Sequence, residues 1–163
     1  GYTIGTSLSE SSFLDESKKI LNSENCKKII FPDDVVCAED GVLENPQTKD
    51  ISMVKSSDKI LDVGVDSISK YTKILRVCQT IFWNGPLGYV EKAPYDKGTS
   101  EIAKIIANAD CFSAIGGGDT VPVIEKLGLN DQFSFLSTGG GALMKFFEGS
   151  NMPILTKLGL DDK

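Results

Sequence analysis

The hydrophobic positions of this chain form short continuous runs that alternate with stretches of helical spacing. Strands are predicted by three runs of apolar, β-prone residues, at 79–83, 111–115 and 133–136. Elsewhere apolar residues recur every three or four positions, which predicts helices over 66–75, 99–109, 119–127 and 142–147. Gly149 follows the last of these helices, where the left-handed backbone position favours glycine.

The first third of the chain has a less regular pattern. Hydroxyl residues within 9–12 precede apolar residues at helical spacing, which predicts a helix ending near 22–23. The apolar run at 28–32 predicts a short strand stopped by Pro32, and 35–37 is expected to extend the same edge. Polar residues dominate from 39 to 58, so this stretch is expected to be either a loop or a small antiparallel excursion.

The repeated order of strand followed by helix places the chain in the α/β class. We expect a three-layer, Rossmann-like fold with a parallel sheet, because the strands are short and continuously apolar. The 163 residues show neither an internal repeat nor a domain boundary, which indicates a single domain. The chain begins with Gly1 and runs directly into structured-looking sequence, so we expect it to be a piece of a longer chain.

Composition excludes several classes of function. With 23 acidic residues, 17 basic residues and a net charge of −6, the chain lacks the basic stripe of a nucleic-acid-binding surface. It contains no histidine, which excludes Ser-His-Asp and Cys-His mechanisms built from this chain alone. The four cysteines are scattered and are expected to be reduced core residues. No signal peptide and no membrane-spanning run is present, so a cytoplasmic location is expected.

A glycine triplet follows the strand predicted at 111–115. Gly116, Gly117 and Gly118 let the backbone approach a ligand closely, and the N-terminus of the next helix attracts an anion. Asp119 either caps that helix or holds Mg²⁺ carried by a nucleotide, because a hard cation prefers carboxylate oxygen. Thr120 offers a hydroxyl to a phosphate oxygen. The pattern predicts a nucleotide-phosphate site, with a plain tight turn as the alternative.

A second triplet, Gly139, Gly140 and Gly141, follows the strand predicted at 133–136 in the same way. Ligands bind beyond the carboxyl ends of parallel strands, so both triplets are expected to face one crevice. One triplet would hold the bound phosphates, while the other would stabilise a phosphoryl group in transfer.

The strand predicted at 79–83 ends in a third group of candidate residues. Asn84 can donate to a phosphate or sugar oxygen. Glu91 can accept hydrogen bonds from ribose hydroxyls, although by itself it also fits an ordinary solvated carboxylate. Trp83 is expected in the core rather than beneath a nucleotide base.

The order and the amino-acid sequences of these segments resemble those of the phosphoglycerate kinase family. The similarity lies in IFWNGPLGYVE, KGTSEIA, IGGGDT and LSTGGGAL, and it extends upstream to IIFPDDVV. It covers nearly the whole chain. It implies that residues 1–163 are a partial nucleotide-binding, C-terminal domain, with the parallel sheet truncated at its N-terminal side.

The resemblance also implies roles for the candidate residues. Glu91 would bind the ribose hydroxyls and Asn84 would lie against the nucleotide phosphates. The first triplet, Gly116 to Gly118, would line the phosphate path, with Asp119 on nucleotide-bound Mg²⁺ and Thr120 on a phosphate. Gly139, Gly140 and Gly141 would present helix N–H groups to the phosphoryl group. The family's glycolytic reaction transfers that group reversibly between 1,3-bisphosphoglycerate and ADP, giving 3-phosphoglycerate and ATP.

The chain departs from the family pattern at two positions. Val65 follows Asp62, Val63 and Gly64 where proline is usual, so the turn there is less constrained. Ile60 stands where glycine is common on the adenine side, which puts the contact with the base in question.

The cationic residues of the family's active site are the larger departure. The basic patch for phosphoglycerate and the lysines for the nucleotide phosphates would lie before Gly1, and Arg76 is the only arginine here. We therefore expect the chain alone to be inactive. Whereas the parent enzyme is expected to be monomeric, the free sheet edge of this chain invites self-association. Two alternatives remain, an independent dinucleotide-binding module and a non-catalytic remnant. The contiguous glycine triplets differ from the G-x-G-x-x-G fingerprint of the first alternative.

Overall fold

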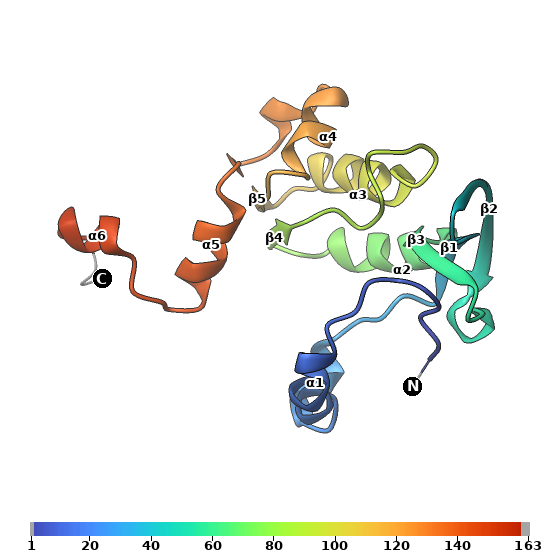
Figure 1. Cartoon of the computed structure of the whole chain (residues 1–163). Helices are drawn as coiled ribbons and strands as arrows, with labels where there is room; N and C mark the ends of the chain where they lie inside the picture. Colours follow the sequence, from blue (N-terminus) through green and yellow to red (C-terminus); the bar gives the residue numbers. More distant parts are fainter. Residues whose placement is uncertain (1, 161–163) are drawn as a thin grey trace.

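Two separate three-stranded sheets organise the chain in the computed structural model, which describes residues 2–160 (Figure 1). The first sheet has the order β2-β1-β3 and is antiparallel, and the second has the order β4-β5-β6 and is parallel. The parallel sheet and the alternation with helices confirm the α/β class. Within residues 2–160, no helix has the length and hydrophobicity that crossing a membrane requires.

The antiparallel sheet occupies the stretch for which the sequence left a loop or an excursion open. Its strands are β1 (Asp34–Glu39), β2 (Val42–Asp50) and β3 (Asp58–Val63). Within 39–58 the antiparallel excursion is therefore confirmed, because β2 pairs with β1. The strand predicted at 28–32 is wrong, because Glu24–Lys28 forms the 3-10 helix η2 and 29–31 is exposed without a ladder partner. A short apolar run becomes a strand only where a neighbouring strand satisfies its backbone.

The parallel sheet contains the three strands that the apolar runs predicted. These are β4 (Thr80–Asn84), β5 (Phe112–Gly116) and β6 (Phe135–Ser137). The register aligns Asn84 with Gly116, and Gly116 with Ser137. All three strands therefore end at the same edge of the sheet. β4 borders only β5 within this sheet, so its other side is a free edge.

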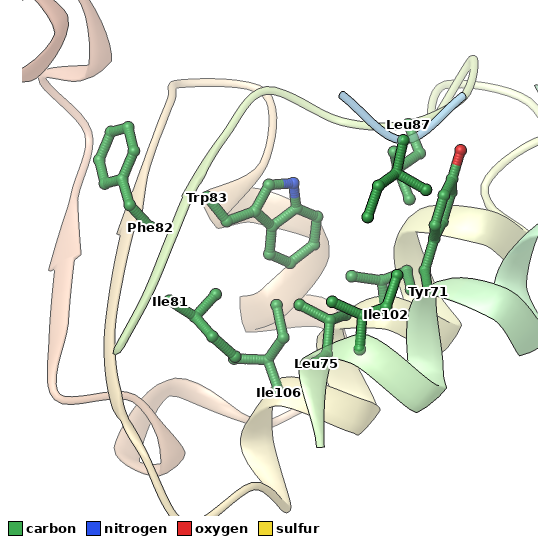
Figure 2. Close-up of a pocket in the computed structure, with 10 residues that line it drawn as sticks. Tyr71, Leu75, Ile81, Phe82, Trp83, Leu87, Ile102 and Ile106 are labelled. Atoms are coloured by element: carbon green, nitrogen blue, oxygen red, sulfur yellow. The ribbon is translucent and has the colours of Figure 1, made fainter. Parts of the chain in front are cut away.

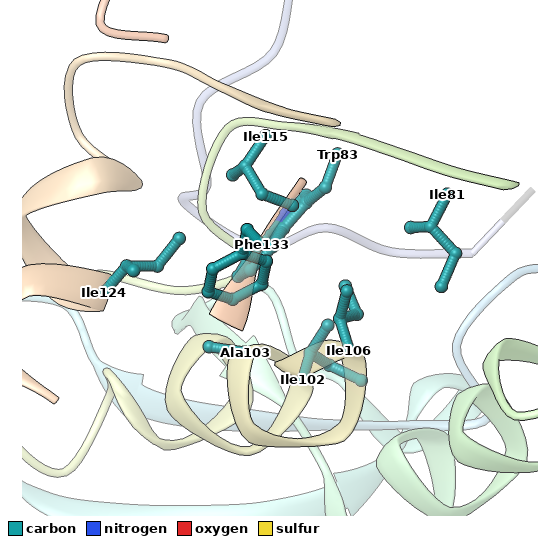
Figure 3. Close-up of a cluster of buried hydrophobic side chains, with 8 residues drawn as sticks. All are labelled: Ile81, Trp83, Ile102, Ala103, Ile106, Ile115, Ile124 and Phe133. Carbon is teal, nitrogen blue, oxygen red and sulfur yellow. The ribbon is translucent and has the colours of Figure 1, made fainter. Parts of the chain in front are cut away.

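One face of the parallel sheet is covered by α3 (Lys97–Ala107) and α4 (Val121–Lys126). Side chains from both helices share one core with the strands, as Figure 3 shows: Ile81, Trp83, Ile102, Ala103, Ile106, Ile115, Ile124 and Phe133. On the opposite face Phe82, Phe112 and Phe135 are exposed. There α5 (Gly140–Phe147) supplies the contact, with the rings of Phe147 and Phe82 centred 4.5 Å apart. The expected third layer is thus represented by α5.

The helices at the two ends of the chain lie outside the core of the parallel sheet. Helix α1 (Leu14–Leu21) is confirmed, but all of its residues are exposed. Helix α6 (Pro153–Lys157) follows α5 at the far end of the chain from the sheets (Figure 1). Gly149 has a φ of +69°, as its place after α5 predicted. All four cysteines are free thiols, and of these only Cys37 is buried.

Helix α2 (Val65–Leu75) is fastened to β1 by a buried carboxylate. Asp34 accepts hydrogen bonds from the amide N–H of Asp66 at 3.1 Å and from both the amide and the hydroxyl of Ser67 at 2.7 Å. Burial opposes ionisation, but these donors outweigh it and hold the pKa of Asp34 below its ordinary value. Asp34 therefore satisfies the first turn of α2 from another element.

Replacing Asp34 with asparagine is expected to lower the free energy of unfolding by about 1 to 2 kcal/mol, the size of a lost helix cap with its charged hydrogen bonds. Urea unfolding followed by circular dichroism measures the change. Asp15→Asn, on the exposed surface of α1, is the control and should stay within experimental error. An Asp34→Asn protein as stable as the original would contradict the capping role.

Candidate functional site

The three predicted glycine and asparagine segments meet at the carboxyl edge of the parallel sheet. The Gly117 N–H donates to the Ser137 carbonyl oxygen at 3.1 Å, and the Gly85 N–H donates to the Gly116 carbonyl oxygen at 3.4 Å. The Gly139 N–H donates to Ser137 Oγ at 3.1 Å. These bonds connect the turns that follow β4, β5 and β6. Both triplets therefore lie at one edge of the sheet, and that they face a single crevice stays a prediction.

At three glycines of this edge a side chain would be crowded or its backbone strained. A Cβ at Gly140 would lie 2.6 Å from Asn84 Oδ1 and 2.8 Å from Gly117 Cα. A Cβ at Gly116 would lie 3.1 Å from the same Asn84 oxygen, and Gly117 has a φ of +121°. The two triplets thus pack against each other around the Asn84 side chain.

The outer glycines of the two triplets leave open space. A Cβ at Gly118 or Gly141 would meet no atom within 4 Å, and one at Gly139 would meet only Ser137 Oγ, at 3.5 Å. Helix α5 begins at Gly140 after Gly139, which makes no side-chain cap. In residues 2–160, no acceptor pairs with the amide N–H of Gly141 or Ala142. An anion can therefore approach this helix end without displacing a side chain.

Glu91 lies at the same pocket as the first triplet. A pocket of about 240 Å³ is lined by Val90, Glu91, Asp96, Gly118, Asp119, Pro122, Val123 and Lys126. It joins the segment after β4, the turn after β5 and helix α4. Sequence reasoning missed Asp96 and Lys126, which approach to 3.8 Å between Lys126 Nζ and Asp96 Oδ2. Lys126 is on a helix defined only by its apolar spacing, so no local pattern marked it.

Asp119 does not cap the helix that follows it. Helix α4 begins at Val121, and Thr120 occupies the N-cap position without a side-chain cap bond. Asp119 is exposed, and its carboxylate has no hydrogen bond or ion pair with any other residue the structure describes. Within those residues no group of three or more metal-ligating side chains occurs. A single free carboxylate fits a cation that arrives with its other ligands, as nucleotide-bound Mg²⁺ does.

Thr120 and Trp83 are buried. Thr120 Oγ1 has no hydrogen-bond partner in the described part of the chain, and a Cβ at Gly117 would lie 3.2 Å from it. The contact of Thr120 with a phosphate stays a prediction. Trp83 belongs to the core and donates from Nε1 to the Gly85 carbonyl oxygen at 2.7 Å. This bond connects the core to the turn after β4.

The two positions that depart from the family pattern have ordinary structural roles. Ile60 lies on β3 and packs against the small core of the antiparallel sheet. Val65 is the first residue of α2, a position where proline would also fit. Ile60 lines a pocket of about 300 Å³ with Leu61, Gly88 and Tyr89, which is separate from the pocket of Glu91.

An apolar cavity of about 350 Å³ lies away from the glycine triplets. Figure 2 shows it between α2, α3 and β4, with Tyr71, Leu75 and Ile106 around it and Phe82 pointing to the opposite side of the strand. The cavity contains no titratable group apart from the Tyr71 phenol. It follows the free edge of β4 and has none of the polar groups that a phosphate requires.

Comparison with known proteins agrees with this geometry. The family model described as "Phosphoglycerate kinase" matches residues 1–150. The chain belongs to the phosphoglycerate kinase family. The phosphoglycerate kinase of Baumannia cicadellinicola subsp. Homalodisca coagulata is 40% identical over 159 residues, which are 97% of this chain and 40% of that protein.

Solved phosphoglycerate kinases share the fold as well. The structure from Coxiella burnetii has a TM-score of 0.86 and 35% identity, and covers 96% of this chain and 41% of its own. The structure from Pyrococcus horikoshii OT3 has a TM-score of 0.81 and 30% identity, and covers 92% and 37%. The resemblance read from the glycine segments is confirmed. The chain spans about two fifths of the length of the phosphoglycerate kinases it matches.

Proposed function

We propose that this chain provides the Mg²⁺-nucleotide half of a phosphoglycerate kinase active site. The observation that carries the proposal is the shared pocket of Glu91, Gly118 and Asp119, directly beside the contact between the two glycine triplets. Family membership supports a kinase. The pocket and the triplets supply the ribose-binding carboxylate, the bare backbone and the metal-binding carboxylate that ADP or ATP requires.

Each group has a distinct part in the proposed reaction. Glu91 accepts hydrogen bonds from the ribose hydroxyls, and Asp119 faces the cation that neutralises the phosphate charge. The backbone of Gly117 and Gly118 and the Asn84 side chain border the phosphates, with Thr120 behind them. The N–H groups at the start of α5 stabilise the phosphoryl group between ADP and 1,3-bisphosphoglycerate. Positioning and charge neutralisation are sufficient, because phosphoryl transfer demands little covalent chemistry from the protein.

We expect the positively charged residues that bind the phosphate groups to be supplied by residues outside this sequence. The chain carries one arginine, Arg76 directly after α2, and its net charge is −6. We propose that 3-phosphoglycerate binds to a part of the phosphoglycerate kinase fold that these residues do not provide. The chain alone should therefore show no phosphoglycerate kinase activity in a purified assay. The parent enzyme is expected to act in the cytoplasm. Self-association through the free edge of β4 stays a prediction, which ultracentrifugation would test.

Binding of ADP to the purified chain tests the proposed function. Calorimetry should detect binding that is tighter with Mg²⁺ than with EDTA. Asp119→Asn should remove most of that difference, about tenfold in affinity, because one charge-assisted contact is lost.

Asp131→Asn is the matched control for this experiment. Asp131 is on η4 (Asn130–Gln132), which precedes β6 and so lies at the opposite end of the strands from the triplets. This variant should bind Mg-ADP like the original chain. ADP affinity that is equal with and without Mg²⁺ in the original chain would contradict the role of Asp119, and the absence of any ADP binding would contradict the proposed function.

A further inference from the structure

A buried carboxylate with no cationic partner lies near the end of β3. Asp62 is 2% exposed, and the described residues form no ion pair with it. Its Oδ2 accepts a hydrogen bond from the Gly98 N–H at 2.7 Å, and its Oδ1 accepts one from the Val63 N–H at 2.8 Å. Gly98 belongs to the first turn of α3, so the carboxylate connects β3 to the N-terminus of that helix.

Both ends of the segment 88–98 pack against the carboxyl group of Asp62. A Cβ placed on Gly88 or on Gly98 would overlap Asp62. The beginning of the segment is held to β3 as well, because the Tyr89 N–H donates to the Leu61 carbonyl oxygen at 2.7 Å. Just before it, the Leu87 N–H donates to Oγ1 of the buried Thr99 at 3.0 Å.

The segment 88–98 carries part of the candidate nucleotide pocket. Glu91 and Asp96 lie within it, and both line the pocket with Gly118 and Asp119. The Glu91 side chain is exposed and has no hydrogen bond or ion pair to another residue in the described part of the chain. Its placement therefore depends on the backbone of the segment, which packs against Asp62 at Gly88 and donates a hydrogen bond to it at Gly98.

The ionisation of Asp62 is balanced between opposing influences. Burial is the largest and raises the pKa to about 6, while the Gly98 and Val63 N–H groups favour the charged form. The nearby charges are those of Asp96, which raises the pKa, and Lys97, which lowers it. An asparagine side chain at this position would place its NH2 donor against one of the two N–H groups.

We propose that Asp62 is a positioning residue that fixes the segment 88–98 and thereby sets Glu91 for the nucleotide ribose. The inference rests on the proposed function, because it takes Glu91 to be a nucleotide ligand. Asp62 acts through the segment, since it lines a different pocket from Glu91.

The test combines ADP calorimetry with amide hydrogen exchange on the full chain. Asp62→Asn should weaken Mg-ADP binding about tenfold and speed exchange in 88–98, as expected for loss of a charged hydrogen bond. Glu91→Gln should weaken binding in the original chain but add little in the Asp62→Asn background, because Glu91 is already displaced. Asp34→Asn is the control: it alters a similar buried network at α2 and should change neither affinity nor exchange in 88–98.

The outcomes separate the inference from the proposed function. Asp62→Asn with the original affinity, or with effects additive to those of Glu91→Gln, would overturn the positioning role. If Glu91→Gln leaves affinity unchanged, the proposed function fails, and exchange in 88–98 alone then decides whether Asp62 fixes the segment. Should Asp62→Asn not fold, Asp62→Glu gives the same exchange comparison at one pH, because its longer side chain moves the carboxylate away from the Gly98 N–H. Protection in 88–98 equal to that of the original chain would then overturn the inference.

Discussion

Replacing Gly140 with alanine is expected to abolish measurable Mg-ADP binding and to lower the free energy of unfolding by about 1 to 3 kcal/mol, the usual range for overpacking. The new Cβ would lie 2.6 Å from Asn84 Oδ1 and 2.8 Å from Gly117 Cα. Asn84 can turn away, but the Gly117 backbone cannot move without opening the turn after β5. The two triplets would separate, and the groups that border the phosphates would lose their shared geometry.

Gly141→Ala is the matched control for this substitution, one residue further along α5. A Cβ there would meet nothing within 4 Å, so the variant should be as stable as the original chain or slightly more stable. Calorimetry with Mg-ADP and urea unfolding measure both effects. If the two variants bind ADP equally well, close packing of the triplets is not what builds the site.

The candidate site was largely predictable because its signals are local. A strand end, a run of glycines and a helix start are contiguous in sequence, and parallel strands bring their carboxyl ends together. Asn84, Gly116 and Gly140 therefore meet as the pattern indicated. The convergence of Glu91 on Asp119 required the fold, since the path of the segment 88–98 depends on contacts with β3.

The less predictable parts depend on contacts between distant residues. The run at 28–32 has strand composition but no neighbouring strand, and β3 forms because β1 lies beside it. Asp62 was noted only as part of a turn, because a single carboxylate among apolar residues does not reveal that it will be buried between two glycines. Burial of a charge is a property of the assembled fold. Here that burial identifies a candidate functional residue that the sequence alone does not reveal.

Asp62 should also make the stability of the chain depend on pH in an unusual direction. Its pKa is raised from 3.8 to about 6 by burial, so the folded chain binds a proton more readily than the unfolded chain. The stabilisation from this group is complete below pH 3.8 and is lost as pH rises through about 6. At about 1.4 kcal/mol for each pKa unit, the loss between pH 4 and pH 7.5 is about 2 to 3 kcal/mol.

Urea unfolding of the original chain and of Asp62→Asn across this range isolates the effect. Their difference in unfolding free energy should shift by about 2 to 3 kcal/mol in favour of the variant as pH rises from 4 to 7.5. Groups common to both chains cancel, including Asp34, whose lowered pKa stabilises the fold above its own value instead. A difference that is constant with pH would show that Asp62 is not buried as a charge. The predicted slope means that the fold accommodates the protonated form of Asp62 better than the charged form, which is the expected cost of burying a carboxylate that has no cationic partner.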